Sequence, residues 1–341
     1  MDKKYTREEF LSKFYNLKYN DIIFHENIVN MLKKISTNND IPHIIFYGNN
    51  GCGKKTLINI LLEFLFGKTI YDIHIRECDV SGSGGKSNKV PIPTTENHII
   101  LEPNNNNFDK YLIREVVKDY VKKKPLTMFN DSKKYKVVQI NKLDNLSLVA
   151  QDGLRRTIEK YSENCRFICY CNSLSKITEP IKSRFLCIHV PSVSVNIIKE
   201  FINDICLKEN IIIKKNDINK IISNDVNIVL NNIYNYSVGE NLQCEEYNIK
   251  IDELIEKIKN KKINEMREII YSLTLNNKTE YELLIDVSVK ILKDVKNSNK
   301  EKEIINCLSQ YEILLNKSRR MIILMETIFM KISKIINEPK I

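Results

Sequence analysis

The sequence predicts an open parallel α/β sheet in the first half of the chain, followed by a small helical unit and an all-helical region. Short apolar runs typical of buried strands alternate with segments of helical periodicity up to Pro191. One of these runs leads into a glycine-rich loop and then a helix, and beyond Pro191 helical periodicity dominates. We therefore expect three units, at residues 1–191, 192–240 and 241–341.

Composition indicates an ordinary globular protein with a positive surface. The 341 residues are 43% hydrophobic and 28% charged, and their formal net charge is +10. This charge fits a polyanionic partner such as nucleic acid, but an excess of solvated lysine would give the same value. The amino terminus lacks the apolar core of a signal peptide and no run approaches a membrane span, so we expect an intracellular protein without a membrane partner.

Nine cysteines raise the question of disulfides or a metal centre. Cys165, Cys169 and Cys171 lie in CRFICYC, where the last two alternate like buried side chains of a strand. No C-x-x-C pair occurs in the sequence. We therefore expect reduced thiols in the core and no metal centre built from cysteine.

Several apolar segments of the first half predict buried strands of a parallel sheet. They are IPHIIFYG (41–48), HIILEP (98–103), KYKVVQIN (134–141), RFICYCN (166–172) and FLCIHVP (185–191). The segment IYDIHIREC (70–78) indicates one more strand. The stretch SGSGGKSNKVP (81–91) predicts a turn because it is rich in glycine and serine.

The loop after the first strand carries most of a phosphate-binding motif. In GNNGCGKKT, Gly48, Gly53 and Lys54 fit the template G-x-x-x-x-G-K-[ST]. Backbone N–H groups at the start of the next helix would hold phosphate oxygens, and Lys54 would reach the terminal phosphates. A glycine-rich turn without a ligand is the alternative, but the flanking strand and helix favour nucleotide binding. The candidate residues are Gly48, Asn49, Asn50, Gly51, Cys52, Gly53, Lys54, Lys55 and Thr56.

The groups that Mg²⁺-dependent hydrolysis needs are missing from this pattern. The position after Lys54, which ordinarily offers a hydroxyl to Mg²⁺, is Lys55. The strand KVVQIN ends at Asn141, where an acidic residue is expected, and Lys142 follows it, where a water-activating glutamate is expected. Only Asp144 remains of the acidic pattern. We expect a site that binds ATP or ADP with little or no hydrolysis, and in which Lys55 and Lys142 supply the positive charge of the metal.

Two stretches resemble the small subunits of replication factor C, the eukaryotic sliding-clamp loader. They are IPHIIFYGNNGCGKKT (41–56) and the region 136–191, which contains AQDGLRRTIEKYSENCRF, CNSLSK and PIKSRFLCIHVP. The resemblance implies that the three units are an AAA+ P-loop core, a helical lid and a helical collar. The GKKT loop and the weakened acidic strand are similar to those of the small subunit at the end of the five-membered arc, whose own nucleotide site is degenerate.

The resemblance also implies roles for single residues. Asn172 corresponds to the first sensor, an amide that contacts the terminal phosphate. Arg184 corresponds to the arginine finger that enters the ATP site of a neighbouring subunit, where a guanidinium suits the charge of a transferring phosphoryl group. Asn227 stands where the family has the arginine of its second sensor. A turn-forming asparagine and a helix-capping surface arginine are the alternatives for the first two residues.

Basic residues on two predicted helices are candidates for DNA contact. In the family, the helix that carries Arg114, Lys118 and Lys122 here lines the inside of the subunit spiral and follows the duplex phosphates. Arg155 and Arg156 lie on the central helix, where the family couples DNA contact to the ATP sites. A solvated basic face is the alternative for the first group, and a structural ion pair is the alternative for one member of the second.

We expect one subunit of a replication factor C-like hetero-oligomer with a PCNA-like sliding clamp and primer–template DNA as partners. Its place would be the nucleus or, for a virus-encoded protein, a viral replication site. Two alternatives stay open. The chain could be a competent ATPase in which Thr56 and Asp144 bind the metal, or a shared subunit of an alternative loader in DNA-damage signalling.

Overall fold

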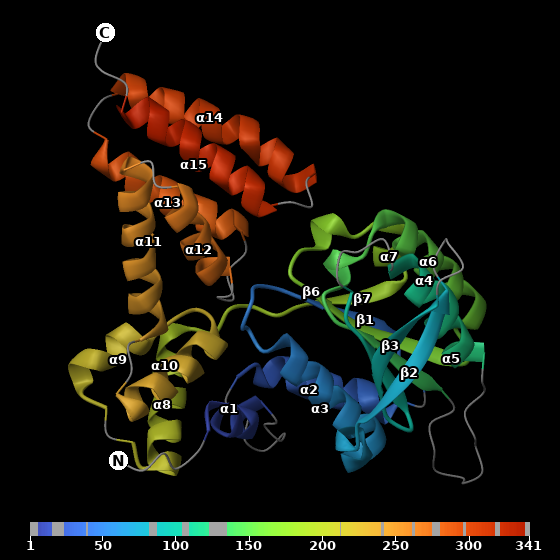
Figure 1. The fold of residues 1–341 in the computed structure, drawn as a ribbon. Helices are drawn as coiled ribbons and strands as arrows, with labels where there is room; N and C mark the ends of the chain where they lie inside the picture. Colours follow the sequence, from blue (N-terminus) through green and yellow to red (C-terminus); the bar gives the residue numbers. More distant parts are fainter. Residues whose placement is uncertain are drawn as a thin grey trace. The chain divides into compact units, whose positions relative to one another are not determined.

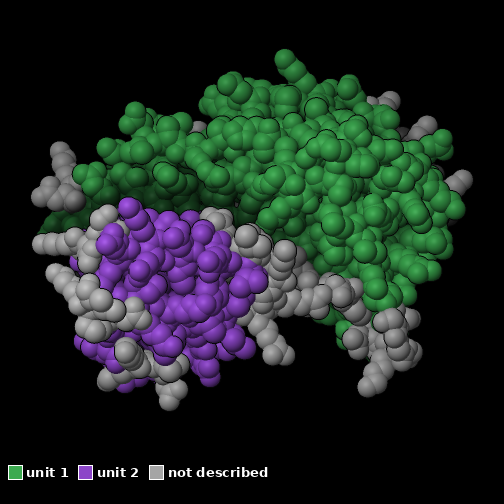
Figure 2. Space-filling model, turned by 90° about the horizontal axis from the view of Figure 1, so that it is seen from above, with its two compact units in different colours: residues 1–238 green, residues 239–341 purple. Residues whose placement is uncertain are grey.

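The computed structural model of this chain describes residues 6–15, 24–38, 40–81, 87–103, 109–122, 135–211, 213–239, 242–260, 263–274, 280–295, 298–317 and 321–337. The chain divides into two compact units, residues 1–238 and 239–341, which Figure 2 shows in different colours. Within the described ranges, we find no helix that combines the length and the apolar character required to cross a membrane.

A sheet of seven described strands forms the centre of the first unit, in the order β2-β3-β4-β5-β6-β1-β7. The strands from β4 to β7 in this order run parallel, and β2 and β3 form an antiparallel hairpin beside β4 (Figure 1). The predicted open parallel sheet is therefore confirmed, with an antiparallel addition at one edge. The strands are β1 (His43–Tyr47), β2 (His74–Ser81), β3 (Ser87–Thr94), β4 (His98–Leu101), β5 (Lys136–Ile140), β6 (Cys165–Cys171) and β7 (Phe185–His189).

The antiparallel hairpin corrects one prediction. The sequence predicts a turn over residues 81–91, but β3 begins inside this stretch at Ser87, and residues 82–86 lie outside the described ranges. Val80 on β2 and Ile92 on β3 are both buried, so the hairpin contributes two apolar side chains to the core. Tertiary packing therefore outweighs the turn-forming composition of the stretch.

Helices cover both faces of the sheet because successive side chains of a strand point to opposite faces. On β1, Ile44 and Phe46 belong to one apolar cluster, together with α2 and α3, whereas Ile45 belongs to the other, together with η3, α5, α6 and α7 (Figure 1). Serine at position 147 begins α6 by accepting a hydrogen bond from Ala150 N. These helical elements are α2 (Glu26–Thr37), α3 (Lys54–Phe66), η2 (Gly67–Tyr71), α4 (Asp109–Tyr111), η3 (Leu112–Val117), α5 (Lys118–Lys122), η4 (Leu143–Asn145), α6 (Leu148–Tyr161), η5 (Leu174–Lys176) and α7 (Glu179–Lys182).

A helical group follows the sheet within the first unit. The first helix of the chain packs against it, since the ring centroid of Phe10 lies 5.6 Å from that of Tyr234 and the Arg7 guanidinium donates to Asn231 Oδ1. The expected boundary between core and lid at residue 191 stays a prediction. The helices of this group are α1 (Arg7–Tyr15), α8 (Val195–Glu209), α9 (Lys215–Ile221) and α10 (Val226–Val238).

The second unit is helical throughout its described residues. Its core contains fully buried side chains such as Leu254, Ile270 and Phe329. A bidentate ion pair joins Arg267 to the largely buried Glu326. Nε of the arginine donates to Oε1 of the glutamate, and Nη2 donates to Oε2 at 2.8 Å. The helices are α11 (Gln243–Lys259), α12 (Ile263–Thr274), α13 (Glu280–Asp294), α14 (Ser298–Lys317) and α15 (Met321–Asn337).

Candidate nucleotide-binding site and arginine edge

The predicted phosphate loop connects β1 to α3 and approaches its neighbours closely at two glycines. Gly48 has a φ of 155° and Gly51 a φ of 67°, a backbone region that L side chains rarely adopt. A Cβ atom on Gly48 would lie 2.2 Å from Val190 O, and one on Gly51 would lie 1.8 Å from Asp225 Oδ1. The loop therefore packs against the end of β7 and the start of α10, and both glycines are required for this fit.

Lys54 begins α3, and its ammonium lies inside the loop. Nζ donates to Gly48 O and to Asn49 O, each at 2.6 Å, and the side chain is largely buried. Burial lowers the pKa of Lys54, while the nearby thiols and Asp144 act in the opposite direction. A bound phosphate would compete with the two carbonyls for the same ammonium.

The remaining residues of the motif lie around this ammonium with different exposures. Asn49 donates from Nδ2 to Ser192 Oγ at 3.1 Å. Asn50 and Lys55 are exposed, Gly53 and Thr56 are half-buried, and Cys52 is buried. Gly53 precedes α3 in the left-handed conformation, with a φ of 93°. The predicted loop residues therefore lie together at the amino end of α3, some buried and some exposed.

Two further contacts hold the loop from outside. His25 Nε2 donates to Cys52 O at 2.9 Å, and burial lowers the pKa of this histidine. At the start of α10, Val226 N donates to Gly51 O at 3.2 Å, while Asp225 Oδ1 accepts from Asn227 N at 2.8 Å. The sequence reasoning missed His25, because a lone histidine far from the motif gives no signal of this contact.

An amide and two lysines occupy the expected metal side. Asn141 is buried at the end of β5, where its Nδ2 donates to Glu102 Oε1 at 2.7 Å and its Oδ1 accepts from Gln139 Nε2 at 2.9 Å. Lys142 and Lys55 are both exposed. In the described part of the chain, no group of three or more His, Cys, Asp or Glu side chains could hold a metal ion. These three positions therefore offer no carboxylate or hydroxyl oxygen to Mg²⁺.

Asp144, the one acidic residue that remains of the expected pattern, contacts the predicted sensor. Its Oδ2 accepts a hydrogen bond from Asn172 N at 3.2 Å, and its Oδ1 is buried without a partner among the described residues. Asn172 follows β6, and its side chain is half-buried. The fold brings these two residues together at the carboxyl end of the sheet, where Asp144 also lies close enough to Lys54 to affect its pKa. Contact of Asn172 with a phosphate stays a prediction.

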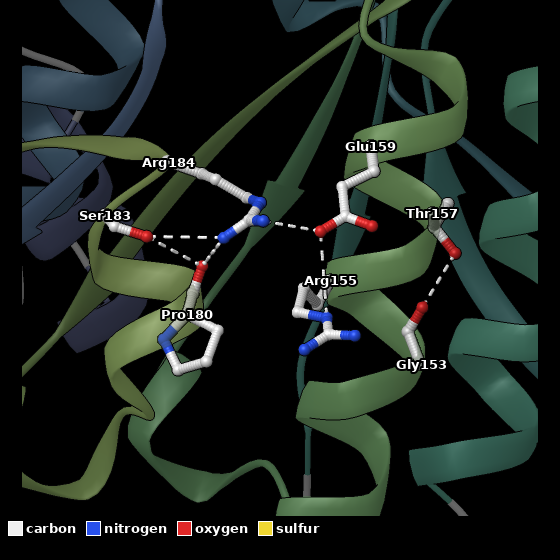
Figure 3. A network of polar contacts seen from close by, with 7 residues as sticks. All are labelled: Gly153, Arg155, Thr157, Glu159, Pro180, Ser183 and Arg184. Atoms are coloured by element: carbon white, nitrogen blue, oxygen red, sulfur yellow. Dashed lines mark hydrogen bonds and ion pairs between the residues drawn. The ribbon is translucent and has the colours of Figure 1, made fainter.

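Arg184 lies just after α7 and keeps 35% of its side chain exposed. Its Nη2 donates to Glu159 Oε1 on α6 at 2.6 Å, and its Nη1 donates to Pro180 O and Ser183 Oγ (Figure 3). Arg155, one of the two arginines predicted to couple DNA to the ATP sites, shares the same glutamate oxygen at 3.7 Å. The structure therefore brings two predicted site residues to one carboxylate that the sequence reasoning did not single out.

The residues predicted to contact DNA lie on η3, α5 and α6. Gly153 of α6 faces Ile113 of η3, because a Cβ atom on the glycine would lie 3.9 Å from Ile113 Cγ2. On η3 and α5, Arg114 is exposed, Lys118 is half-buried, and Lys122 is exposed with its Nζ 3.4 Å from Asp119 Oδ1. Arg156 is exposed on α6, and Arg155 is half-buried. Contact of these residues with DNA stays a prediction.

Comparison with known proteins finds similar sequences and similar solved structures. The sequence matches the family of the DNA polymerase III delta subunit over residues 24–194. A replication factor C small subunit of Acanthamoeba polyphaga mimivirus is 32% identical over 322 residues, which are 91% of this chain and 86% of that protein. Replication factor C subunit 3 of Arabidopsis thaliana is 37% identical over 207 residues, 59% of this chain and 58% of the relative. The solved structure of a DNA polymerase III gamma-subunit-related protein from Thermotoga maritima aligns over 90% of this chain and 98% of its own, at 15% identity and a TM-score of 0.46.

Proposed function

Because this chain belongs to the family of replication factor C small subunits, we propose that it is one subunit of a hetero-oligomeric clamp loader. In this role it helps to load a PCNA-like sliding clamp onto primer–template DNA. It binds ATP or ADP in its own loop with little or no hydrolysis, and it supplies Arg184 to the ATP site of a neighbouring subunit. The observation that carries the proposal is the contrast between a phosphate loop that keeps its glycines and Lys54 and a metal side whose expected acidic position is the buried amide of Asn141.

Nucleotide in the chain's own site acts as a structural ligand. Backbone N–H groups of the loop and the Lys54 ammonium would hold the phosphates, since both are at the amino end of α3. The exposed Lys55 and Lys142 would supply the positive charge that Mg²⁺ ordinarily brings. A ligand that binds only the folded state stabilises that state, which gives this site a use without turnover.

Arg184 acts on the neighbouring subunit. A guanidinium carries five N–H donors, and three hydrogen bonds occupy Arg184 within the described part of the chain. Two donors therefore remain for phosphate oxygens. An arginine supplied in trans stabilises the charge of the transferring phosphoryl group.

The exposed basic residues follow the DNA backbone. Arg114 and Lys118 on η3 and α5, together with Arg156 on α6, would neutralise phosphates without reading the bases. Lys122 contributes less, because Asp119 already neutralises its charge. Binding of this kind is independent of sequence and weakens as salt rises.

One observation favours a second candidate, a hydrolytically competent site. Asp144 Oδ1 is buried and has no partner among the described residues, and Asp144 lies near Lys54. With Thr56 as a hydroxyl donor, this carboxylate could contribute to metal binding. Turnover that is lost on Asp144→Asn and kept on Arg184→Ala in the assembled complex would favour this candidate over the proposal.

Purification of the tagged chain from its native source tests the proposal directly. We expect four related subunits and a ring-shaped clamp to accompany it, and the identity of the large subunit separates a replicative loader from an alternative loader of DNA-damage signalling. A monomer that hydrolyses ATP on its own would overturn the proposal.

A further inference from the structure

Tyr170 places a large aromatic ring on the face of the sheet that α3 covers. It lies on β6 two residues before Asn172, and its register partner in β1 is Phe46. Tyr170 and Phe46 pack in the apolar cluster that includes α3, whereas Cys169 and Cys171 belong to the cluster on the other face. The half-buried ring therefore lies on the same side of the sheet as the phosphate loop.

The ring stands next to the ammonium of the loop. Nζ of Lys54 lies 6.0 Å from the centroid of the Tyr170 ring, which is within the range of a cation–π contact. The two hydrogen bonds of the same ammonium go to carbonyl groups of the loop. The ring therefore borders the place where Lys54 would hold the terminal phosphates.

The same ring ends a row of side chains that runs along the expected metal side. The last register pair of β5 with β6 stands one residue before Asn141 and Tyr170, and the last pair of β4 with β5 stands one residue before Glu102 and Asn141. The hydrogen bond from Asn141 Nδ2 to Glu102 Oε1 joins the second pair of neighbours. Glu102, Asn141 and Tyr170 thus follow one another across the carboxyl ends of three strands.

Two carboxylates lie near the hydroxyl of this tyrosine. Burial raises the pKa of Tyr170 to about 12, and the charges of Glu102 and Asp144 act in the same direction. The phenol therefore stays neutral, and it offers Mg²⁺ no charged oxygen. Mg²⁺ demands octahedral coordination and retains several waters, so it needs open space beside a carboxylate. A Mg²⁺ ion near these two carboxylates would meet a neutral aromatic side chain instead.

We propose that Tyr170 is a specificity-determining residue of the loop site, whose ring takes the space that hydrated Mg²⁺ would need between phosphates on Lys54 and the carboxylates of Glu102 and Asp144. The proposal rests on the nucleotide binding proposed above for the loop. It goes beyond the missing metal ligands, because a restored hydroxyl at position 55 would then give only part of the usual response to Mg²⁺. The protein's own cations, in place of a metal, would neutralise the nucleotide.

The test measures the affinity of the full chain for a fluorescent ADP, in Mg²⁺ and in EDTA. Lys55→Thr is the background, since it removes an ammonium and returns the usual hydroxyl. Tyr170→Ala removes the ring, and Tyr170→Phe keeps the ring without its hydroxyl. Tyr161→Ala on α6 is the matched control, because Tyr161 is also half-buried and has Lys160 Nζ 5.7 Å from its ring centroid.

The readout is the ratio of the affinity in Mg²⁺ to the affinity in EDTA. In the Lys55→Thr background, we expect Tyr170→Ala to raise this ratio by about tenfold, since the metal can then bridge the phosphates and the carboxylates. Tyr170→Phe and Tyr161→Ala should keep the ratio of the background. The affinity in EDTA reports that the loop is still folded. Tyr170→Leu, with a smaller apolar side chain, should give an intermediate ratio and replaces Tyr170→Ala if the latter unfolds.

The outcomes separate this inference from the proposed function. If Tyr170→Ala and Tyr170→Leu change the affinity equally in Mg²⁺ and in EDTA, the ring does not exclude the metal, and the inference is wrong while the proposed function stands. A rise of the ratio in Tyr170→Phe as well would assign the effect to the hydroxyl and overturn the role of the ring. If Lys54→Ala leaves the affinity of the wild type for ADP unchanged, the proposed nucleotide site itself fails.

Discussion

The phosphate loop and the Arg184 edge hold their cations in opposite ways. At the loop, Lys54 is 6% exposed and its ammonium is bound by two carbonyls of the loop itself. At the other edge, Arg184 is 35% exposed and retains donors that no described residue occupies. The first cation is enclosed by its own loop, and the second is partly exposed to solvent.

The difference shows that binding and chemistry can be assigned to different parts of one core. Around the loop, the backbone and the lysine suited to phosphate are present, but Asn141 and Lys55 replace the groups that would bind a metal. Around Arg184, a carboxylate and a carbonyl hold the guanidinium in place. In the proposed function, the loop would bind a stable ligand and the arginine would act on another chain.

Removal of the Arg184 side chain should have the largest effect on turnover, and it tests the difference between the two edges most directly. Arg184→Ala should lower turnover at the neighbouring site by roughly 10³-fold, because the charge of the transition state loses its stabilising cation. The measurement is phosphate release by reconstituted complexes in which the other ATP sites are inactivated. Lys182→Ala is the matched control, since this lysine pairs with Glu179 on the same helix. An equal loss of turnover from Lys54→Ala would show that the loop contributes to hydrolysis as much as Arg184 does.

A methyl group at Gly51 tests how the loop is built. Gly51→Ala would push a carbon into Asp225 at a φ of 67°, whereas Gly67→Ala has a similar φ of 70° and open space around it. We expect Gly67→Ala to cost about 1–3 kcal/mol of unfolding free energy, from backbone strain alone. Gly51→Ala should cost about 1–3 kcal/mol more, from the clash. Urea unfolding measures both, and equal costs would mean that the loop and α10 separate easily.

Loss of the buried Lys54 tests whether nucleotide binding at the loop is separate from turnover at the neighbouring site. Lys54→Ala should raise the dissociation constant for nucleotide at this site by about 10- to 100-fold, since a hydrogen bond from a charged group contributes about 1.5–3 kcal/mol. Fluorescent nucleotide titration measures the affinity, and Lys68→Ala at an exposed position is the control. Turnover of the complex should stay at the wild-type level. Unchanged affinity would show that the loop is not the nucleotide-binding site.

A smaller effect is expected from the basic residues of η3 and α5, which belong neither to the phosphate loop nor to the Arg184 edge. Arg114→Ala combined with Lys118→Ala should reduce the slope of log affinity for duplex DNA against log salt by about 2, one unit for each lost phosphate contact. Lys160→Ala, at an exposed position of α6, should leave the slope unchanged. A slope that the double variant does not alter would place the DNA elsewhere.

The smallest expected effect concerns the metal. We expect nucleotide to stay in the wild-type site when EDTA removes Mg²⁺, because Lys55 and Lys142 supply positive charge. Lys55→Thr restores the usual hydroxyl and should make retention depend on Mg²⁺. Gel filtration with EDTA, followed by nucleotide quantification, measures retention. Complete loss from the wild type would contradict the substitution of lysine for metal.

The strands and the loop could be predicted because their signals are local. The apolar run before Gly48, the glycine-rich loop and the helical spacing after Lys54 each depend on neighbouring residues, and all three are confirmed as elements of the fold. Strand β3 was the exception, because the glycine- and serine-rich composition of residues 81–91 indicates a turn, whereas β3 pairs with the neighbouring β2 from Ser87 onward.

The contacts between distant segments could not be predicted in the same way. Glu159 and Arg184 are separated by 25 residues and meet because α6 and the α7 segment pack on one face of the sheet. Glu102 reaches Asn141 because β4 pairs with β5, and this order of strands is not encoded in any short pattern. Single candidate residues could be identified from the sequence motifs, but their contact partners could be identified only from the fold.

The hairpin of β2 and β3 also affects how the protein behaves at high concentration. In the described residues β3 pairs with β4 only at Thr94 and Ile99, so most of its second edge has no strand beside it. Pro91 and Pro93 stand two positions apart in the continuous ladder with β2, and each lacks the N–H that would point to this second edge. An open edge poor in donors is a weak template for a strand of another molecule. The two prolines therefore protect the sheet from aggregation on this side.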